Sequence, residues 1–143
     1  MASSYQTTRR VEFCDTDAAG MMHFTAFFRF MEQAEHELLR QLGSSVVSQD
    51  AEGSISWPRA SANCDFQRAV AFEDELTIQL SVARLGTTSV TYQCNFQLDG
   101  EAVARGQIVS VCCRMTADAA PEPLAIPAAL REQLQHYVSP QQD

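Results

Sequence analysis

The chain has 143 residues, with 18 Asp and Glu against 10 Lys and Arg, so its formal net charge is −8. This length suits one domain spanning residues 1–143 with a single hydrophobic core, and the acidic balance excludes the broad basic surface of a nucleic-acid-binding protein. No stretch approaches the roughly 18 apolar residues of a membrane span. With five cysteines but no Cys-x-x-Cys pair, we expect reduced thiols and a cytoplasmic protein without nucleic-acid or membrane contacts.

The first predicted elements are a strand over residues 5–13, a connecting loop over 14–23 and a helix over 24–42. Apolar side chains recur in the helix at spacings of three and four residues, which is the pattern of one buried helical face. Gly43 is a natural stop for this helix. The buried stripe is expected to consist of Phe24, Phe27, Phe28, Met31, Ala34, Leu38, Leu39 and Leu42.

One carboxylate interrupts the apolar stripe. At about 100° per residue, Glu35 projects between Phe28 and Leu39, and Glu32 lies at the edge of the stripe. A carboxylate in such a place is costly unless it is paired or faces a cavity. Glu35 is therefore either a hydrogen-bonded residue at a pocket rim or subunit interface, or a carboxylate that faces substrate.

Strand patterns dominate the second half of the chain. Residues 44–56 are polar and predict an irregular segment, and Asp99-Gly100 predicts a tight hairpin turn. A short helix is expected from Pro127 to Tyr137. Four strands are predicted, over residues 57–70, 75–85, 87–98 and 102–115.

This order of elements predicts an α+β fold. One curved, antiparallel, five-stranded sheet wraps around the long central helix, because a helix this apolar needs a sheet to cover it. The edge strands of such a sheet remain open, so pairing with a second subunit is favoured.

Two carboxylates, Asp15 and Asp17, precede the helix beside the small-residue turn Ala-Ala-Gly. A helix N-terminus carries unpaired N–H groups and partial positive charge, so it attracts oxyanions. A carboxylate next to such a helix end predicts a hydrolytic site, because the N–H groups stabilise negative charge on a reacting carbonyl oxygen.

The run Asp-Thr-Asp-Ala-Ala-Gly ahead of this helix resembles the hotdog-fold acyl-CoA thioesterases, and most of all the 4-hydroxybenzoyl-CoA thioesterase family. The similarity spans residues 5–135. It is carried by Phe13, Asp15, Thr16, Asp17, Ala19, Gly20, Phe24, Phe28 and Glu32, with support from Trp57-Pro58, Asp65-Phe66, Phe72-Glu73-Asp74, Leu85-Gly86 and Ile126-Pro127.

The resemblance implies hydrolysis of an acyl-CoA thioester to the free acid and CoA. In that pattern Asp17 is the nucleophile or general base, and the backbone N–H of Phe24 polarises the thioester carbonyl. Asp15 is then expected to brace the turn. Some relatives carry a His at the position of Phe24; here His23 stands one residue earlier, as either a catalytic helper or a structural, hydrogen-bonded residue. No cofactor is expected, and the three histidines are too dispersed in sequence for a metal site.

Substrate contacts are predicted on three segments. The acyl pocket is expected to be lined by Met21, Met22, Phe24, Phe27 and Phe28, and the resemblance adds Glu32. Core packing is the alternative for all five apolar residues, and above all for Phe27 and Phe28. The CoA phosphates need cations or hydroxyls, for which the candidates are Arg84, Thr87 and Thr88, with Arg59 and Arg114 as further cations.

The resemblance also implies a homodimer, and for many relatives a homotetramer. The alternative function is a non-catalytic acyl-CoA-binding or structural hotdog dimer, although such a protein needs no carboxylate at Asp17. A hotdog dehydratase is disfavoured because its Gly-Asp-x-Asn-Pro stretch is absent.

Overall fold

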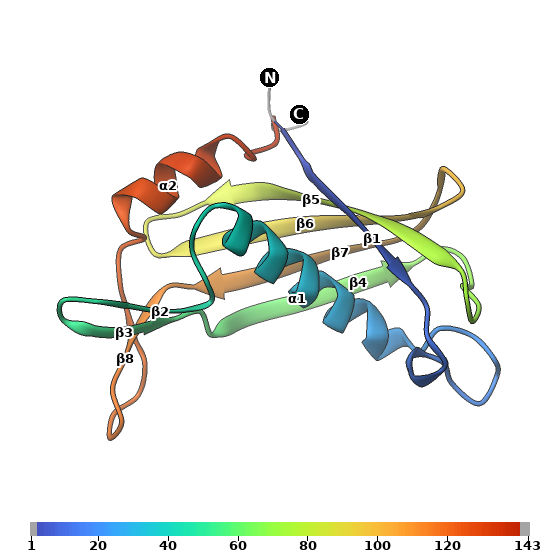
Figure 1. Ribbon diagram of the computed structural model, residues 1–143, viewed down its shortest axis with the longest axis horizontal. Helices are drawn as coiled ribbons and strands as arrows, with labels where there is room; N and C mark the ends of the chain where they lie inside the picture. Colours follow the sequence, from blue (N-terminus) through green and yellow to red (C-terminus); the bar gives the residue numbers. More distant parts are fainter. Residues whose placement is uncertain (1–2, 141–143) are drawn as a thin grey trace.

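The main sheet has five antiparallel strands in the spatial order β1-β5-β6-β7-β4. The computed structural model describes residues 3–140. A long helix, α1 (Phe24–Gln41), lies across one face of this curved sheet (Figure 1). The predicted α+β architecture, a five-stranded sheet around a central helix, is thereby confirmed. The strands are β1 (Tyr5–Arg10), β4 (Arg59–Phe66), β5 (Glu75–Leu85), β6 (Ser89–Leu98) and β7 (Glu101–Val111).

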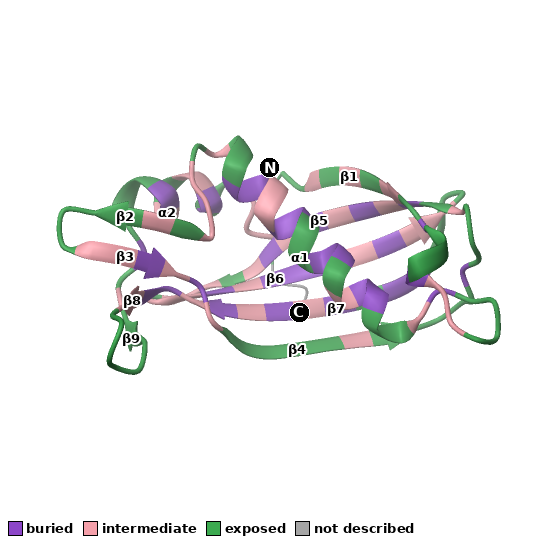
Figure 2. Cartoon of the chain, turned by 60° about the horizontal axis from the view of Figure 1, so that its bottom comes forward, coloured by how far each residue is buried: buried purple, intermediate pink, exposed green. Residues whose placement is uncertain are grey.

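The core lies between α1 and the inner face of the sheet. Along β5, buried residues alternate with half-buried ones, because successive side chains of a strand point to opposite faces. The inner-face residues Leu76, Ile78 and Leu80 are fully buried. Figure 2 shows the same alternation on the central strands and the buried stripe of α1 above them. Apolar burial on this inner face therefore holds the helix in place.

Gly106 of β7 sets how closely the helix approaches the sheet. A Cβ atom at this position would overlap Met31 Sδ and lie 3.0 Å from the backbone oxygen of Asn63. Glycine inside a strand weakens pairing and often marks a close approach by another group. Here that group is the fully buried Met31 of α1.

A second, smaller sheet covers the C-terminal end of α1. The segment 44–56, predicted as irregular, instead contains a hairpin. Its strands are polar and bury one side chain, Ile55, so the sequence shows little of the alternation that predicts strands. The order of this sheet is β2-β3-β8-β9. Its strands are β2 (Val47–Asp50), β3 (Gly53–Ser56), β8 (Cys113–Met115) and β9 (Glu122–Pro123).

The predicted C-terminal helix is present as α2 (Ala128–Gln135), with Pro127 at its N-cap. It packs beside β5 at the same end of the molecule as the small sheet (Figure 1). No helix among residues 3–140 combines the length and the apolar composition that crossing a bilayer requires.

The first strand is shorter than predicted. β1 ends at Arg10, and the chain then forms a short 3₁₀ helix, η1 (Phe13–Asp15). Val11 is buried and exchanges backbone hydrogen bonds with Glu73 and Asp74. Phe13 therefore lies beyond the strand, and its side chain is 78% exposed.

β4 is an open edge of the main sheet. It pairs with β7 on one side, and all its residues are exposed except the half-buried Cys64. Figure 2 shows this strand as an almost continuously exposed border. An unpaired strand edge is a template for pairing with another strand.

Glu35 projects into the buried face of α1 as expected, and it is 1% exposed. Its carboxylate is paired: Arg59 Nη1 and Ser110 Oγ each donate to Oε2 over 2.8 Å. Burial acts to lower the pKa of Arg59, but the charges and hydrogen bonds of Glu35 and Glu32 raise it overall. Glu35 is thus a hydrogen-bonded link between the middle of α1 and the start of β4.

Candidate active site

The loop between η1 and α1 folds back on itself and presents Asp17 at its tip. The Asp17 N–H donates to the carbonyl oxygen of Met21 over 2.8 Å, and the Gly20 N–H donates to that of Asp17 over 3.0 Å. Gly20 adopts φ of 81°, a conformation that glycine reaches without strain. The Met22 N–H reaches the carbonyl oxygen of Val70 over 2.6 Å, which ties the loop to the segment after β4.

The two carboxylate oxygens of Asp17 differ. Oδ1 accepts the N–H of Ala19 over 2.9 Å and that of Met21 over 3.2 Å. Among the hydrogen bonds formed within residues 3–140, none reaches Oδ2. One oxygen is therefore anchored in the loop, while the other is available to a ligand.

The start of α1 lies directly after this loop. His23 is the N-cap: its Nδ1 accepts the N–H of Thr25 over 3.2 Å, so a neutral ring carries its proton on Nε2. The His23 ring stacks on Phe24, with centroids 4.7 Å apart. The N–H of Phe24 has no acceptor among the backbone bonds of residues 3–140. The structure thus gives His23 a capping role and leaves Phe24 N–H free, as expected at a helix N-terminus.

Asp17 borders an apolar hollow of about 370 Å³. Its wall includes Phe27 and Phe66, which pack edge-to-face with ring centroids 5.2 Å apart. Phe24 is 59% exposed and Phe66 is 48% exposed, although both are large and apolar. The lining is formed by Asp17, Met21, Met22, Phe24, Phe27, Phe66, Gln67, Arg68, Ala69 and Val70. Exposed apolar side chains gathered in this way mark a ligand or partner site.

A second hollow, of about 490 Å³, lies on another side of Asp17. It is bordered by Phe13 and Phe72, which make an edge-to-face contact with centroids 6.2 Å apart. Thr16, Ala18 and Gly20 complete it. Asp17 therefore borders both hollows.

The structure gathers only part of the predicted site. Met21, Met22 and Phe24 lie with Asp17 in the first hollow. Phe28 is instead partly buried against the core, and its core-packing alternative is the one observed. Arg68, one of the arginines that the sequence offers to a phosphorylated ligand, also lines this hollow. Sequence reasoning did not assign Phe66 to the lining, although Asp65-Phe66 is part of the family resemblance.

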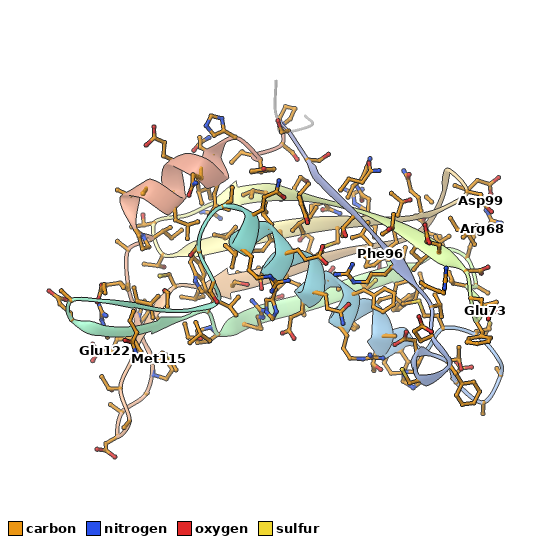
Figure 3. The ribbon with its side chains drawn as sticks, viewed as in Figure 1. Arg68, Glu73, Phe96, Asp99, Met115 and Glu122 are labelled. Carbon is orange, nitrogen blue, oxygen red and sulfur yellow. The ribbon has the colours of Figure 1, made fainter. Side chains whose placement is uncertain are left out.

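The residues proposed for CoA phosphates lie elsewhere in the subunit. Arg84 lies near the end of β5, and Thr87 and Thr88 lie in the β5–β6 turn that follows, next to α2, where Arg131 donates to the carbonyl oxygen of Gly86. Asp17 lies at the other end of the 11-residue strand β5, roughly 35 Å away at about 3.3 Å per residue. In Figure 3, Arg68 and Glu73 mark the Asp17 end, and Met115 and Glu122 mark the opposite end.

The remaining cations of the prediction are engaged. Arg59 Nη2 lies 2.6 Å from Glu35 Oε1 and donates to Glu32 Oε2 over 3.2 Å. Arg114 binds both carboxylate oxygens of Asp50, over 2.6 and 2.8 Å. Glu32, predicted as a substrate contact, is therefore paired with Arg59 in the single subunit.

Buried thiols do not offer an alternative nucleophile. Burial raises the pKa of the Cys112 thiol to about 11, and burial also raises that of Cys94. Both thiols are protonated at neutral pH, and the thiolate is the reactive form. Within residues 3–140, no three His, Cys, Asp or Glu side chains are grouped as metal ligands.

A five-stranded sheet wrapped around one long helix, with a carboxylate at that helix's N-terminus, defines a hotdog-fold protein. Residues 11–134 match the thioesterase-like superfamily, and the chain belongs to it. It is a thioester hydrolase, because its relatives are named as hydrolases of such esters. The match is to the superfamily, and the narrower 4-hydroxybenzoyl-CoA assignment stays a prediction.

Among the relatives is a 1,4-dihydroxy-2-naphthoyl-CoA hydrolase from Synechococcus sp. (strain WH7803), 33% identical over 114 residues, which cover 75% of this chain and 74% of the relative. A solved gentisyl-coenzyme A thioesterase is 27% identical with a TM-score of 0.79, over 91% of this chain and 99% of that chain. A 1,4-dihydroxy-2-naphthoyl-CoA thioesterase from Synechocystis has a TM-score of 0.81 at 19% identity, over 93% of this chain and 96% of that chain, and shows the shared fold.

Proposed function

We propose that this protein hydrolyses an aromatic acyl-CoA thioester to the free acid and CoA, with Asp17 as the reacting carboxylate. The observation that carries this proposal is that Asp17 and Phe24 lie beside the same hollow. Oδ2 of Asp17 and the N–H of Phe24 both lack a hydrogen-bond partner within residues 3–140, and both residues border the same apolar hollow. A carboxylate oxygen and an N–H donor are the two groups that attack on a thioester carbonyl requires.

In the proposed reaction, the acyl group occupies the first hollow and its carbonyl oxygen accepts the N–H of Phe24. Asp17 then acts in one of two ways. Its oxygen bonds to the carbonyl carbon as the C–S bond breaks, the thiolate leaves, and water hydrolyses the resulting anhydride. Alternatively, Asp17 takes a proton from a water that attacks the same carbon; the C–S bond then breaks, and the CoA thiolate leaves and takes up that proton. His23 caps the helix and so holds the N–H of Phe24 in a fixed direction.

The aromatic acyl class rests on the lining of the hollow. Phe24, Phe27 and Phe66 offer ring faces and edges to a planar group, while Met21 and Met22 adapt to its outline. The names of two relatives specify dihydroxynaphthoyl and gentisyl groups, which are also aromatic. The 4-hydroxybenzoyl group of the predicted subfamily belongs to the same class.

We propose that the enzyme is a homodimer formed through β4. Symmetric antiparallel pairing of two copies of this open edge sets the Arg59 end of one strand against the Phe66 end of the other. The β5–β6 turn lies at the Arg59 end, so Arg84, Thr87 and Thr88 of one copy approach the hollow of the other, and Glu32 approaches with Arg59. Two such dimers, stacked through their outer sheet faces, form the predicted homotetramer.

We further propose that the enzyme acts in the cytoplasm. Its five cysteines, Cys14, Cys64, Cys94, Cys112 and Cys113, are all unbridged. Reduced thiols suit a reducing compartment.

The test is thiol release from a panel of benzoyl-, 4-hydroxybenzoyl-, 1,4-dihydroxy-2-naphthoyl-, hexanoyl- and palmitoyl-CoA. We expect kcat/KM for the aromatic thioesters to exceed that for the aliphatic ones by about tenfold or more, the scale at which a shaped apolar pocket discriminates. A preference for aliphatic chains would overturn the acyl class alone. Tight binding of every thioester without thiol release would instead identify the non-catalytic alternative.

A further inference from the structure

Asp15 is buried, charged and outside both hollows. It is 4% exposed, and besides the Cys14 thiol, whose Sγ lies 4.0 Å from Oδ1, its carboxylate makes two contacts. Oδ2 accepts the N–H of Glu12 over 2.9 Å, and Oδ1 lies 3.0 Å from Nη2 of Arg29. A carboxylate is rarely buried to this extent unless it is paired, because removing a charge from water is costly.

The backbone of Asp15 adds a third contact, since its carbonyl oxygen accepts the N–H of His23 over 2.7 Å. Glu12 lies where the chain leaves β1, His23 is the residue before α1, and Arg29 lies in the second turn of that helix. One residue therefore ties both ends of the loop 16–22 to each other and to α1.

We propose that Asp15, acting through Arg29, is a positioning residue that fixes the carboxylate of Asp17 relative to the N–H of Phe24. This inference rests on the proposed function, because Asp17 lies on the loop and Phe24 lies on the helix. The Asp15–Arg29 pair is the charged link between those two elements. A displacement of about 1 Å between reacting groups can reduce a rate by about a hundredfold.

The negative charge matters as well as the shape. An Asn at position 15 could still accept the N–H of Glu12, but a neutral amide binds a guanidinium more weakly than a carboxylate does. Arg29 is half exposed, so without a charged partner its side chain is free to turn into solvent. The loop would then keep its turn and lose its attachment to the helix.

The molecule contains a matched pair at its other end. Asp50 Oδ1 accepts the N–H groups of Glu52 and Gly53 over 2.9 and 3.1 Å, and Arg114 binds both oxygens of the same carboxylate. As at Asp15, backbone N–H donation and one arginine hold the carboxylate, but Asp50 is 43% exposed whereas Asp15 is buried. Asp50 lies in the β2–β3 hairpin, remote from Asp17.

The experiment compares D15N, R29M, R29K and D50N with the wild-type enzyme on one aromatic acyl-CoA. We expect D15N and R29M to lower kcat roughly 10- to 100-fold with little change in KM, because the reacting groups are misplaced while the hollow is intact. R29K keeps the charge and is expected to recover part of the loss. D50N is expected to change neither constant. Arg29 is half exposed, so R29M tests the inference even where D15N fails to fold.

A second measurement does not depend on turnover. Amide hydrogen exchange over residues 16–22 is expected to quicken in D15N and R29M and to be unchanged in D50N. Wild-type kcat in R29M, or an equal loss in D50N, would overturn the positioning role while leaving the proposed function intact. Absence of thiol release by the wild-type enzyme would overturn the proposed function, and hydrogen exchange would still decide whether Asp15 holds the loop.

Discussion

The two ends of the main sheet use similar residues in opposite ways. At the Asp17 end, large apolar side chains line a hollow of about 370 Å³ and remain exposed, as Phe24 and Phe66 show. At the α2 end, a hollow of about 270 Å³ is lined by side chains such as Trp57 and Leu130, which are buried. Each end also has a carboxylate–arginine pair.

We expect this difference to separate the apolar residues that serve the fold from those that serve a ligand. Trp57 is buried, and removing its apolar surface from water stabilises the folded state. Exposure of Phe66 beside a carboxylate contributes little to stability and provides a surface for another molecule. Variants at the two ends should therefore separate activity from stability, as the following expectations state.

The largest effect is expected at Asp17. The variant D17N keeps the side-chain shape and an oxygen that can accept the N–H of Ala19, but it has no carboxylate to attack or to take a proton. The rate of thiol release from an aromatic acyl-CoA should fall by about 10³-fold or more. Loss of a general acid or base has an effect of this size. Thermal denaturation should show an intact fold. Near-wild-type turnover would show that Asp17 is not the reacting group.

At the opposite end, W57A should give the reverse result. Trp57 is 5% exposed, so its truncation leaves a cavity and should cost about 3–5 kcal/mol of unfolding free energy. Chemical denaturation measures this loss. Below the unfolding transition, kcat/KM should match that of the wild-type enzyme, and a large loss of activity there would break the proposed separation of the two ends.

A smaller effect is expected for F66A in the Asp17 hollow. The half-exposed ring contributes a face to the acyl group, so KM for an aromatic thioester should rise by about tenfold, the scale of a lost apolar contact. The denaturation midpoint should change little. If F66A instead destabilised the protein as W57A does, Phe66 would belong to the core and not to the site.

The smallest effect is expected for D50N, and it should depend on pH. Hydrogen bonds from Arg114, with those from backbone N–H groups, lower the pKa of Asp50 from 3.8 to about 2. A carboxyl with a lowered pKa adds stability that is complete above its unfolded value and is lost as the pH falls through its folded value. The difference in Tm between wild type and D50N should therefore be present at pH 7 and shrink between about pH 4 and pH 2. A difference that stayed constant over this range would rule out the ion pair as its cause.

Periodicity predicted the parts of the fold that bury one full face. The helix expected over 24–42 is observed as Phe24–Gln41, and the strand expected over 75–85 is observed with the same bounds. Both have regular apolar spacing because one side of each element packs on the core. The hairpin of β2 and β3 was missed because it buries only Ile55.

The site was predictable only where it follows the chain locally. The motif before α1 placed Asp17 beside Met21 and Phe24, which are its neighbours in sequence. Phe66 joins them through tertiary packing on Phe27, which no local pattern specifies. The CoA-binding assignment of the β5–β6 turn stays a prediction. Within one subunit this turn and Asp17 lie at opposite ends of β5, and no local sequence pattern specifies that separation.

Gly106 allows α1 to pack closely against the sheet at one point along the helix. Met31, which rests against it, lies seven residues after Phe24, so the two are about 10 Å apart along the axis at 1.5 Å per residue. A side chain at position 106 would raise the helix at that support, and a tilt of about 6° over about 10 Å would swing the N–H of Phe24 by about 1 Å. Close packing at Gly106, in the middle of the sheet, is therefore expected to contribute to the position of the N–H of Phe24 at the helix end.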